Sequence, residues 1–302
     1  MSAALSYPLR FQIGARTLLT ARRRLVRIAL SLDGVLAGAA PDLPPLERRA
    51  DGYVINSLPE ALVGEVAAPA SGLRPFVRQR YTRRFADLDA GFDAYLAGCS
   101  ARSRATLLRK ARRLAERSGG AIDIRVSRTP AEFEAFFAHA RAISRKSYQE
   151  RLLDAGLPED SKPAMLALAA RDAARGFLLF LDDAPVSYLY LPARRETLIY
   201  AYLGYDPEWA DLSPGAVLQL EAMRLLMAEG RFRRLDFTEG DGQHKRQFAT
   251  GGVECVDLLL LRLSFGNLAC VAALNGFDRL VARGKELAER PALRPLTRAL
   301  RR

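Results

Sequence analysis

Polar side chains that could move a proton are concentrated in one stretch of the sequence, RRLDFTEGDGQHKRQFAT, residues 233–250. The chain has only two histidines, and one of them, His244, lies here. An imidazole titrates near neutral pH, so His244 is the natural candidate for a general base. Glu239 or Asp241 could orient it or serve as the base instead, and Lys245 could stabilise developing negative charge. The pattern predicts a proton-transfer site, with a well-solvated polar loop as the alternative.

Asp236 lies between two apolar residues at the end of the short strand that opens this stretch. A carboxylate in such a place is commonly structural, and we expect it to pair with Lys245, Arg246 or a loop amide. It also belongs to the candidate catalytic set, because the polar turn follows directly.

A second feature is the helix start DLSPG, residues 211–215. Ser213 is a good N-cap, Pro214 suits the first helical position, and Gly230 closes the helix. The first amides of a helix lack intrahelical partners, and the helix dipole is positive at that end. An anionic group could therefore bind here, and Gly215 would let it approach the backbone closely. The alternative is an ordinary capped helix.

Composition narrows the class of protein. The 302 residues carry a net charge of +12, which favours anionic partners such as phosphorylated cofactors, nucleic acid or acidic lipid. The alternative is a preference for arginine on solvated faces, although arginines gather at 21–27, 102–117 and 290–302. Three scattered cysteines form neither a disulfide framework nor a metal-like cluster, so we expect no metal and a cytoplasmic setting. The sequence contains no signal-peptide pattern and no long apolar run.

Hydrophobic periodicity predicts the elements that position these residues. Strands are expected at 10–15, 24–32, 52–58, 76–85, 121–126, 176–183, 184–193, 196–206, near 235–237 and at 255–264. Helices are expected from Ser100 or Ser103 to about 118, and at 129–148, 164–174, 213–229 and 265–290. The helix that follows Ser213 has little polar surface and should be mostly buried.

Taken together, these pieces resemble the GNAT acyltransferase superfamily over residues 98–250, about half of the chain. The segments that carry the resemblance are SARSRATLLRKARRLAE, AISRKSYQERL, GYDPEWADLSPGAVLQLEAMRLLMAEG and RRLDFTEGDGQHKRQFA. Within the superfamily the chain looks most like the bacterial branch associated with cellulose and exopolysaccharide biosynthesis, a relative of the Fem-type peptidoglycan transferases.

The resemblance implies an α+β fold of the α/β/α kind, the GNAT acyl-CoA N-acyltransferase fold. A mixed sheet flanked by helices splays open, and the pantetheine arm of an acyl donor lies in the opening. The implied donor is acyl-CoA as a substrate, with an acyl-carrier protein as the alternative because the SPG loop is short. The implied phosphate-binding residues are Ser213, Gly215, Ala216 and Val217, and the thioester would lie near Leu203, Gly204 and Tyr205.

The resemblance also bears on the acceptor side of the site. Where the family has Tyr-Lys this sequence has His-Lys, so we expect His244 to replace the family tyrosine. Arg145, Lys146 and Tyr148 form either a second, substrate-binding wall or a polar helix end. Cys99, Cys255 and Cys270 have no neighbouring base, which disfavours a covalent intermediate.

The expected organisation is an N-terminal β-rich extension (1–90), a GNAT-like core (91–265) and a C-terminal amphipathic helix with a basic tail (266–302). The basic helices would suit the inner face of an anionic membrane, so the preferred acceptor is a lipid amine such as a sphingoid base. A sugar in cellulose or exopolysaccharide biosynthesis is the alternative. A non-catalytic basic binding protein is the competing class, but no nucleic-acid motif is present, so we expect no nucleic-acid partner.

Overall fold

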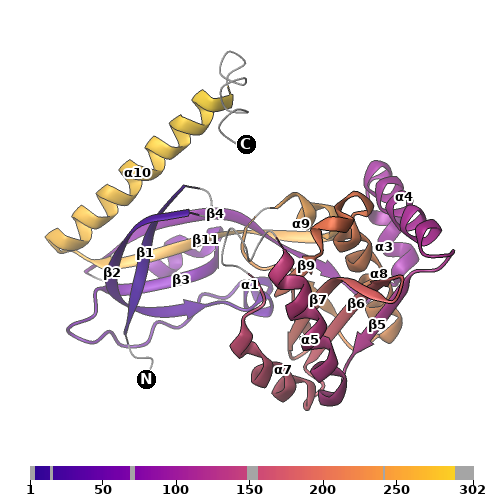
Figure 1. Ribbon diagram of the computed structural model, residues 1–302. Helices are drawn as coiled ribbons and strands as arrows, with labels where there is room; N and C mark the ends of the chain where they lie inside the picture. The colour runs from indigo at the N-terminus through magenta and orange to yellow at the C-terminus, as the bar shows by residue number, and fades with distance from the viewer. Residues whose placement is uncertain (1–3, 14–15, 69–71, 148–155, 241, 290–302) are drawn as a thin grey trace. The chain divides into compact units, whose positions relative to one another are not determined.

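The computed structural model describes residues 4–13, 16–68, 72–147, 156–240 and 242–289. The chain divides into two compact units (Figure 1). One unit comprises Met1–Arg80 and Cys255–Arg302, and the other comprises Tyr81–Glu254. The three-part division expected from the sequence stays a prediction. None of the helices in the described ranges is long and apolar enough to cross a bilayer.

The first unit is built on strands, with one long helix. Its strands follow the order β1-β2-β3-β11-β4 in the sheet. The elements are β1 (Leu5–Ile13), β2 (Arg16–Ala29), α1 (Leu32–Ala37), β3 (Gly52–Pro59), α2 (Val63–Ala67), β4 (Leu73–Asp87), β11 (Gly251–Arg262) and α10 (Phe265–Glu289). Strands β4 and β11 continue into the second unit. Helix α10 buries Cys270, Val271 and Leu274 in a core shared with β1 and β2, which explains its amphipathic pattern.

The second unit continues the sheet in the order β4-β10-β8-β7-β6-β5, with β9 paired to β7. Its strands are β5 (Asp123–Ser127), β6 (Ala174–Leu181), β7 (Ala184–Arg194), β8 (Thr197–Ile199), β9 (Tyr202–Tyr205) and β10 (Arg234–Asp236). Its helices are α3 (Phe92–Gly98), α4 (Ala101–Arg117), α5 (Pro130–Lys146), α7 (Lys162–Ala169), α8 (Pro214–Glu229) and α9 (Gln243–Phe248). Strand β10 runs antiparallel to β4 and parallel to β8, so the sheet is mixed.

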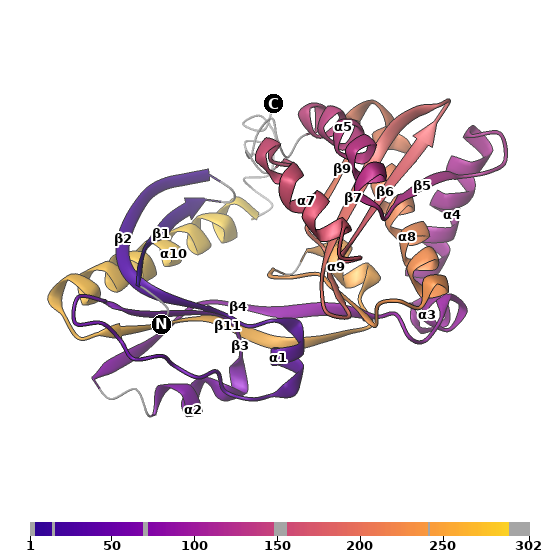
Figure 2. The ribbon, with the colours of Figure 1, turned by 90° about the horizontal axis from the view of Figure 1, so that it is seen from below.

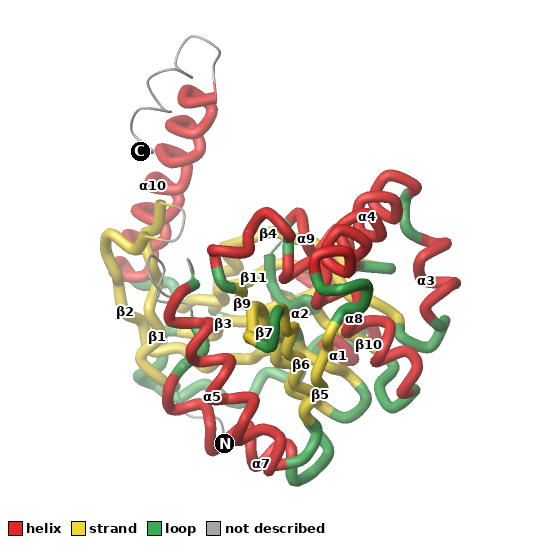
Figure 3. The backbone as a smooth tube through the Cα atoms, turned by 45° about the vertical axis from the view of Figure 1, so that its right-hand side comes forward, coloured by secondary structure: helices red, strands yellow, loops and turns green. Residues whose placement is uncertain are grey.

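Helices cover both faces of this sheet, as Figures 1 and 2 show, which gives the α/β/α layering expected from the sequence. Alternate residues of β6 belong to different cores. Phe177 and Leu179 pack with α4 and α8, whereas Leu178 and Phe180 pack with α5 and α7. Burial on both faces explains why β6 reads as a continuous apolar run. The tube view in Figure 3 shows α5 and α7 on one side of β5–β7.

Local capping signals placed two helix starts correctly. Thr129 and Glu132 form a capping box at the start of α5, with Pro130 in the first turn. Ser100 caps α4 by accepting a hydrogen bond from the Ser103 amide. The expected burial of α8 is confirmed as well, since most of its residues lie in the core.

Several boundaries differ from the sequence-based prediction, among them those of β1 and β2, which begin at Leu5 and Arg16 rather than at residues 10 and 24. The helix expected at 164–174 ends at Ala169, and Ala174 already begins β6. The polar stretch expected to be only a turn contains the short helix α9, and β11 begins at Gly251 rather than at Cys255.

The largest departure is that the strand expected at 196–206 is two strands. Strand β8 pairs with β7 at Ala193 and Arg194, and β9 pairs with β7 again at 187–190. Between these pairs, the three residues 199–201 lie opposite the two residues 191 and 192, which is a β-bulge. Strand β8 also pairs with β10, whereas the pairs of β9 are with β7. The sheet therefore splays beyond Tyr200.

A buried ion pair fixes the end of β10 at this splay. Arg83 on β4 donates from Nη2 to Asp236 Oδ2 at 2.6 Å and from Nε to Oδ1 at 3.2 Å. The two side chains are 8% and 3% exposed. Asp236 Oδ1 also accepts from the Thr238 amide at 2.9 Å, and the Asp236 carbonyl accepts from the Tyr200 amide. The expectation that Asp236 would bond a loop amide is confirmed, but its basic partner is Arg83.

We predict that Arg83→Met lowers the free energy of unfolding by about 3–5 kcal/mol, because it leaves a buried carboxylate without its cation. Urea denaturation measures the change. The matched control is Arg233→Met, which breaks a pair with Asp89 whose side chains are 56% and 49% exposed. That variant should cost much less, because water screens an exposed ion pair. Equal costs for the two variants would contradict the assignment.

Candidate functional site

A cleft of about 590 Å³ opens in the second unit, where the sheet splays. Its lining combines the bulge between β8 and β9, the start of α8, helix α9, and one residue each from α4 and β7. The lining residues are Lys110, Tyr188, Tyr200, Ala201, Tyr202, Leu203, Tyr205, Ala210, Ser213, Gly215, Ala216, Gln219, Gln243, His244, Gln247 and Phe248. The sequence-predicted helix start and the polar stretch thus meet in one cavity.

The start of α8 differs from the expected capped helix. Ser213 adopts a left-handed conformation (φ 54°, ψ 48°), and its side chain makes no capping hydrogen bond. Such a conformation in a residue other than glycine costs about 1–3 kcal/mol and is commonly retained at ligand sites. The hydroxyl does not serve the helix, and Ser213 lines the cleft.

The backbone carbonyl of Ser213 satisfies two of the first helical amides. It accepts from Ala216 at 3.0 Å and from Val217 at 3.2 Å. Pro214 has no amide hydrogen, so within the described part of the chain the Gly215 amide is the one donor of this turn without a protein acceptor. Val217 is buried in the core and is not part of the lining. The available groups of the expected phosphate site are therefore the Ser213 hydroxyl and the Gly215 amide, while Ala216 lines the cleft with its amide already bonded.

Two glycines allow close packing at this end of the cleft. A Cβ on Gly215 would lie 3.0 Å from Leu203 Cδ2. A Cβ on Gly204 would lie 2.4 Å from Tyr188 Cε1, so the ring of Tyr188 fills the space behind Gly204. The Gly204 carbonyl also accepts from the Ser187 hydroxyl at 2.8 Å. The segment expected to hold the thioester thus has a closed rear wall.

Helix α9 brings His244 to the other side of the cleft. Gly242 leaves room for its ring, because a Cβ there would lie 2.9 Å from His244 Cε1. The ring centroids of His244 and Tyr200 are 5.9 Å apart. Partial burial lowers the pKa of the imidazole, and the charge of Lys245 lowers it further. His244 is therefore neutral at pH 7 and can accept a proton, whereas burial raises the pKa of Tyr200, which keeps its hydroxyl a donor.

Three of the remaining catalytic candidates, Asp236, Glu239 and Lys245, do not line the cleft. Asp236 is bonded to Arg83, and Lys245 Nζ donates to the backbone carbonyl of Glu239. The Glu239 side chain is likewise absent from the lining. Asp241 lies outside the described residues.

The α5 residues that were expected to form a second wall of the site make ion pairs outside the cleft. Arg145 pairs with Glu159 at 2.7 Å. Lys146 pairs with the buried carboxylate of Asp206 at 2.7 Å, which raises the pKa of the lysine. Neither residue lines the cleft, and Tyr148 lies outside the described residues.

Among the lining residues that sequence reasoning missed, three show what signal a sequence does or does not carry. Lys110 comes from the basic helix α4, where a lysine among arginines gave no signal of its own. Tyr200 was not singled out, because the sequence pattern predicts one continuous strand where the structure has a bulge. Gln219 had a usable signal, because it is a lone amide between Leu218 and Leu220 in a buried helix.

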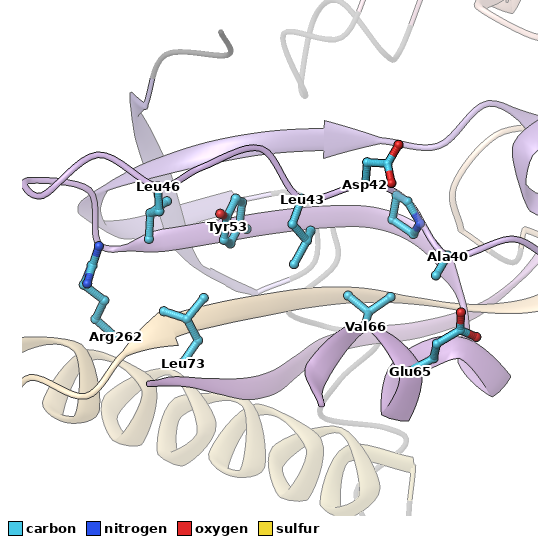
Figure 4. Close-up of a pocket in the computed structure, with 10 residues that line it drawn as sticks. Ala40, Asp42, Leu43, Leu46, Tyr53, Glu65, Val66, Leu73 and Arg262 are labelled. Carbon is cyan, nitrogen blue, oxygen red and sulfur yellow. The ribbon is translucent and has the colours of Figure 1, made fainter. Parts of the chain in front are cut away.

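A second cavity of about 600 Å³ lies in the first unit and is shown in Figure 4. Apolar side chains, among them Leu43, Val66 and Leu73, form its middle, and Arg262 lies at one end. The Arg262 guanidinium donates to backbone carbonyls of Ala50 and Glu47. This cavity contains none of the predicted site residues.

Comparison with known proteins identifies the fold of the second unit. Residues 101–246 match the family described as "Acetyltransferase (GNAT) domain". The C-terminal domain of a putative lysylphosphatidylglycerol synthetase from Agrobacterium fabrum is similar at 14% identity and a TM-score of 0.52, over 74% of this chain and 72% of that one. FemX is similar at 14% identity and a TM-score of 0.52, over 86% and 89% of the two chains. None of the curated proteins matches.

The structural likenesses establish the fold, and the family match adds the chemistry. The splayed mixed sheet, the helix that begins at the splay and the flanking helices form the GNAT fold, with N-terminal strands and a C-terminal helix added to it. Residues 101–246, just under half of the chain, are similar to the GNAT acetyltransferase domain. This similarity supports GNAT-type acyltransferase activity, and GNAT enzymes take acyl-CoA as a substrate.

Proposed function

We propose that the protein transfers a short acyl group, acetyl, from acetyl-CoA to a hydroxyl or amine of a sugar. The observation that carries this proposal is the single cleft with two chemically different ends. One end is the positive start of α8 beside Lys110, and the other presents the neutral imidazole of His244. An anionic donor and a proton-losing acceptor can therefore meet in one cavity.

The donor end suits a phosphorylated thioester. The free Gly215 amide, the Ser213 hydroxyl and the Lys110 ammonium can bind phosphate oxygens, and the helix dipole adds to their field. The pantetheine arm would then run along β9 past Leu203. Because the Tyr188 ring fills the space behind Gly204, the cleft has room for a short acyl chain at this point and not for a long one.

The reaction requires one proton to leave the acceptor. His244 removes it as the acceptor oxygen or nitrogen attacks the thioester carbonyl. The new carbon–oxygen or carbon–nitrogen bond forms, the carbon–sulfur bond breaks, and the thiolate takes up a proton. Tyr200 remains protonated and can donate a hydrogen bond to the developing oxyanion.

The character of the lining favours a sugar acceptor. Tyrosine rings offer faces on which a sugar can stack, and Gln243 and Gln247 of α9 offer amides that bond hydroxyl groups. The same lining contains few aliphatic side chains, so it offers little to the hydrocarbon chain of a lipid.

A lipid amine is the second candidate, and one surface feature of the first unit favours it. The start of α10 exposes Leu263 (56%), Phe265 (89%) and Leu268 (45%). With a net charge of +12, such an apolar patch suits an anionic membrane surface. The acceptor would then be drawn from the membrane, as the basic amphipathic helices had suggested.

We predict that His244→Ala lowers kcat/KM for acetyl transfer by about 100- to 10,000-fold, the usual contribution of a general base. Thiol release from acetyl-CoA in the presence of a panel of sugar acceptors measures the rate. The chain supplies its own control in the second histidine, His139 of α5, which packs edge-on against Phe180. His139→Ala should keep the wild-type rate. An unchanged rate in His244→Ala would remove this residue from the mechanism.

The pH dependence has a defined sign. The neutral ring is the active form, and the pKa of His244 lies below its ordinary value of 6.5. As the pH falls, kcat/KM should therefore decline along an acid limb centred below 6.5, where the ring becomes protonated. Lys245→Met removes a charge that lowers this pKa, so it should move the acid limb to higher pH. An acid limb centred above 6.5 in the wild type would contradict the role of His244.

The lipid alternative predicts membrane contact through the start of α10. The full chain should co-sediment with phosphatidylglycerol vesicles, and Phe265→Ser should weaken this binding about tenfold because a large apolar side chain no longer enters the interface. Leu280→Ser, at a position that is also exposed (68%) but lies further along α10, is the control. If the wild-type protein stays in the supernatant at low salt, the lipid alternative is abandoned.

A further inference from the structure

Gln219 on α8 is a buried amide that the protein itself leaves unpaired. The residue is 2% exposed, and its Nε2 has no hydrogen-bond partner among the described residues. It nevertheless lines the cleft between the start of α8 and the bulge. Its helical neighbours Leu218 and Leu220 are fully buried in the apolar core.

An unpaired amide in a core is costly, because it gives up its hydrogen bonds to water and gains none from the protein. Leucine or methionine would fill the same volume without that cost. Polar groups that break such a local rule are characteristic of functional sites. Since Gln219 is both unpaired and at the cleft surface, the missing partner is expected on a ligand.

The position of Gln219 along α8 defines which part of the ligand it meets. Residues 215, 216 and 219 share one face of the helix, because they are three and four positions apart. The rise of an α-helix places Gln219 about 6 Å further along the axis than Gly215. A ligand whose phosphate rests at Gly215 therefore presents a neutral segment at Gln219.

We infer that Gln219 donates a hydrogen bond to an amide carbonyl of the phosphopantetheine arm of the acyl donor, which makes it a determinant of donor affinity. This inference rests on the proposed function. The arm carries amide carbonyls between its phosphate and its sulfur, so it supplies a neutral acceptor where one is required. The side-chain amide can rotate about its last torsion and turn Nε2 toward the cleft. Coenzyme A and an acyl-carrier protein share this arm.

The experiment is Gln219→Met in the full chain, with separate titrations of donor and acceptor. The KM for the donor should rise about 2- to 10-fold, which is the net contribution of one hydrogen bond, while kcat and the KM for the acceptor stay within twofold. Running acetyl-CoA and acetylated carrier protein in parallel identifies the source of the arm. The donor that the wild type prefers is the one whose KM the variant should raise.

A purely structural role is tested by unfolding the same variant without ligand. Removing an unpaired buried amide should leave the urea midpoint unchanged or raise it, whereas loss of a structural residue would lower it. A lowered midpoint, an unchanged donor KM, or an effect confined to the acceptor KM would each overturn the inference while the proposed function stands. If the wild type consumes neither donor and coenzyme A produces no thermal shift, both the inference and the proposed function are rejected.

Discussion

The cleft depends on the buried ion pair between Arg83 and Asp236. Asp236 connects β10 to two other strands. Its carboxylate accepts hydrogen bonds from Arg83 of β4, and its backbone carbonyl accepts one from the Tyr200 amide at the end of β8. Beyond this point β9 pairs with β7, so the sheet opens at the last residue of β10. Asp236 therefore has a structural role and fixes where the sheet opens, because both of its carboxylate oxygens are already bonded and buried.

Helix α8 combines two tasks that place opposite demands on its sequence. As a core helix it buries apolar side chains against β6 and β7. In the donor-binding role that we propose for it, the helix retains a strained Ser213, a free amide at Gly215 and the unpaired Gln219. Each of these features lowers stability locally, and each faces the cleft. Their shared location is the physical reason to regard this face as a binding surface, because random imperfections would not gather around one cavity.

How much could be predicted from the sequence depends on the range of the interaction. The capping box at Thr129 and the serine cap at Ser100 are contacts over three residues, and they were read correctly. The cavity that unites the start of α8 with His244 was also anticipated, through the family resemblance. The carboxylates were harder to place, because their type suggests acid–base chemistry while their neighbours decide their role. Asp236, which was also expected to be structural, pairs with Arg83, and Glu239 does not line the cleft. Lys146 likewise looked like a wall of the site and proved to be the partner of a buried aspartate.

The sequence by itself determined the longer helices α4, α5, α8 and α10, most strands, the excess of basic charge and the order of elements that resembles the GNAT fold. These follow from periodicity and from contacts between residues close in the chain. Only the tertiary structure decided that Arg83 pairs with Asp236, 153 positions away, and that three residues face two in the bulge that opens the cleft. It also decided that Lys110 and Gln219 join His244. Contacts between distant segments depend on how the sheet and the helices pack. The spacing of residues within one segment therefore does not predict them.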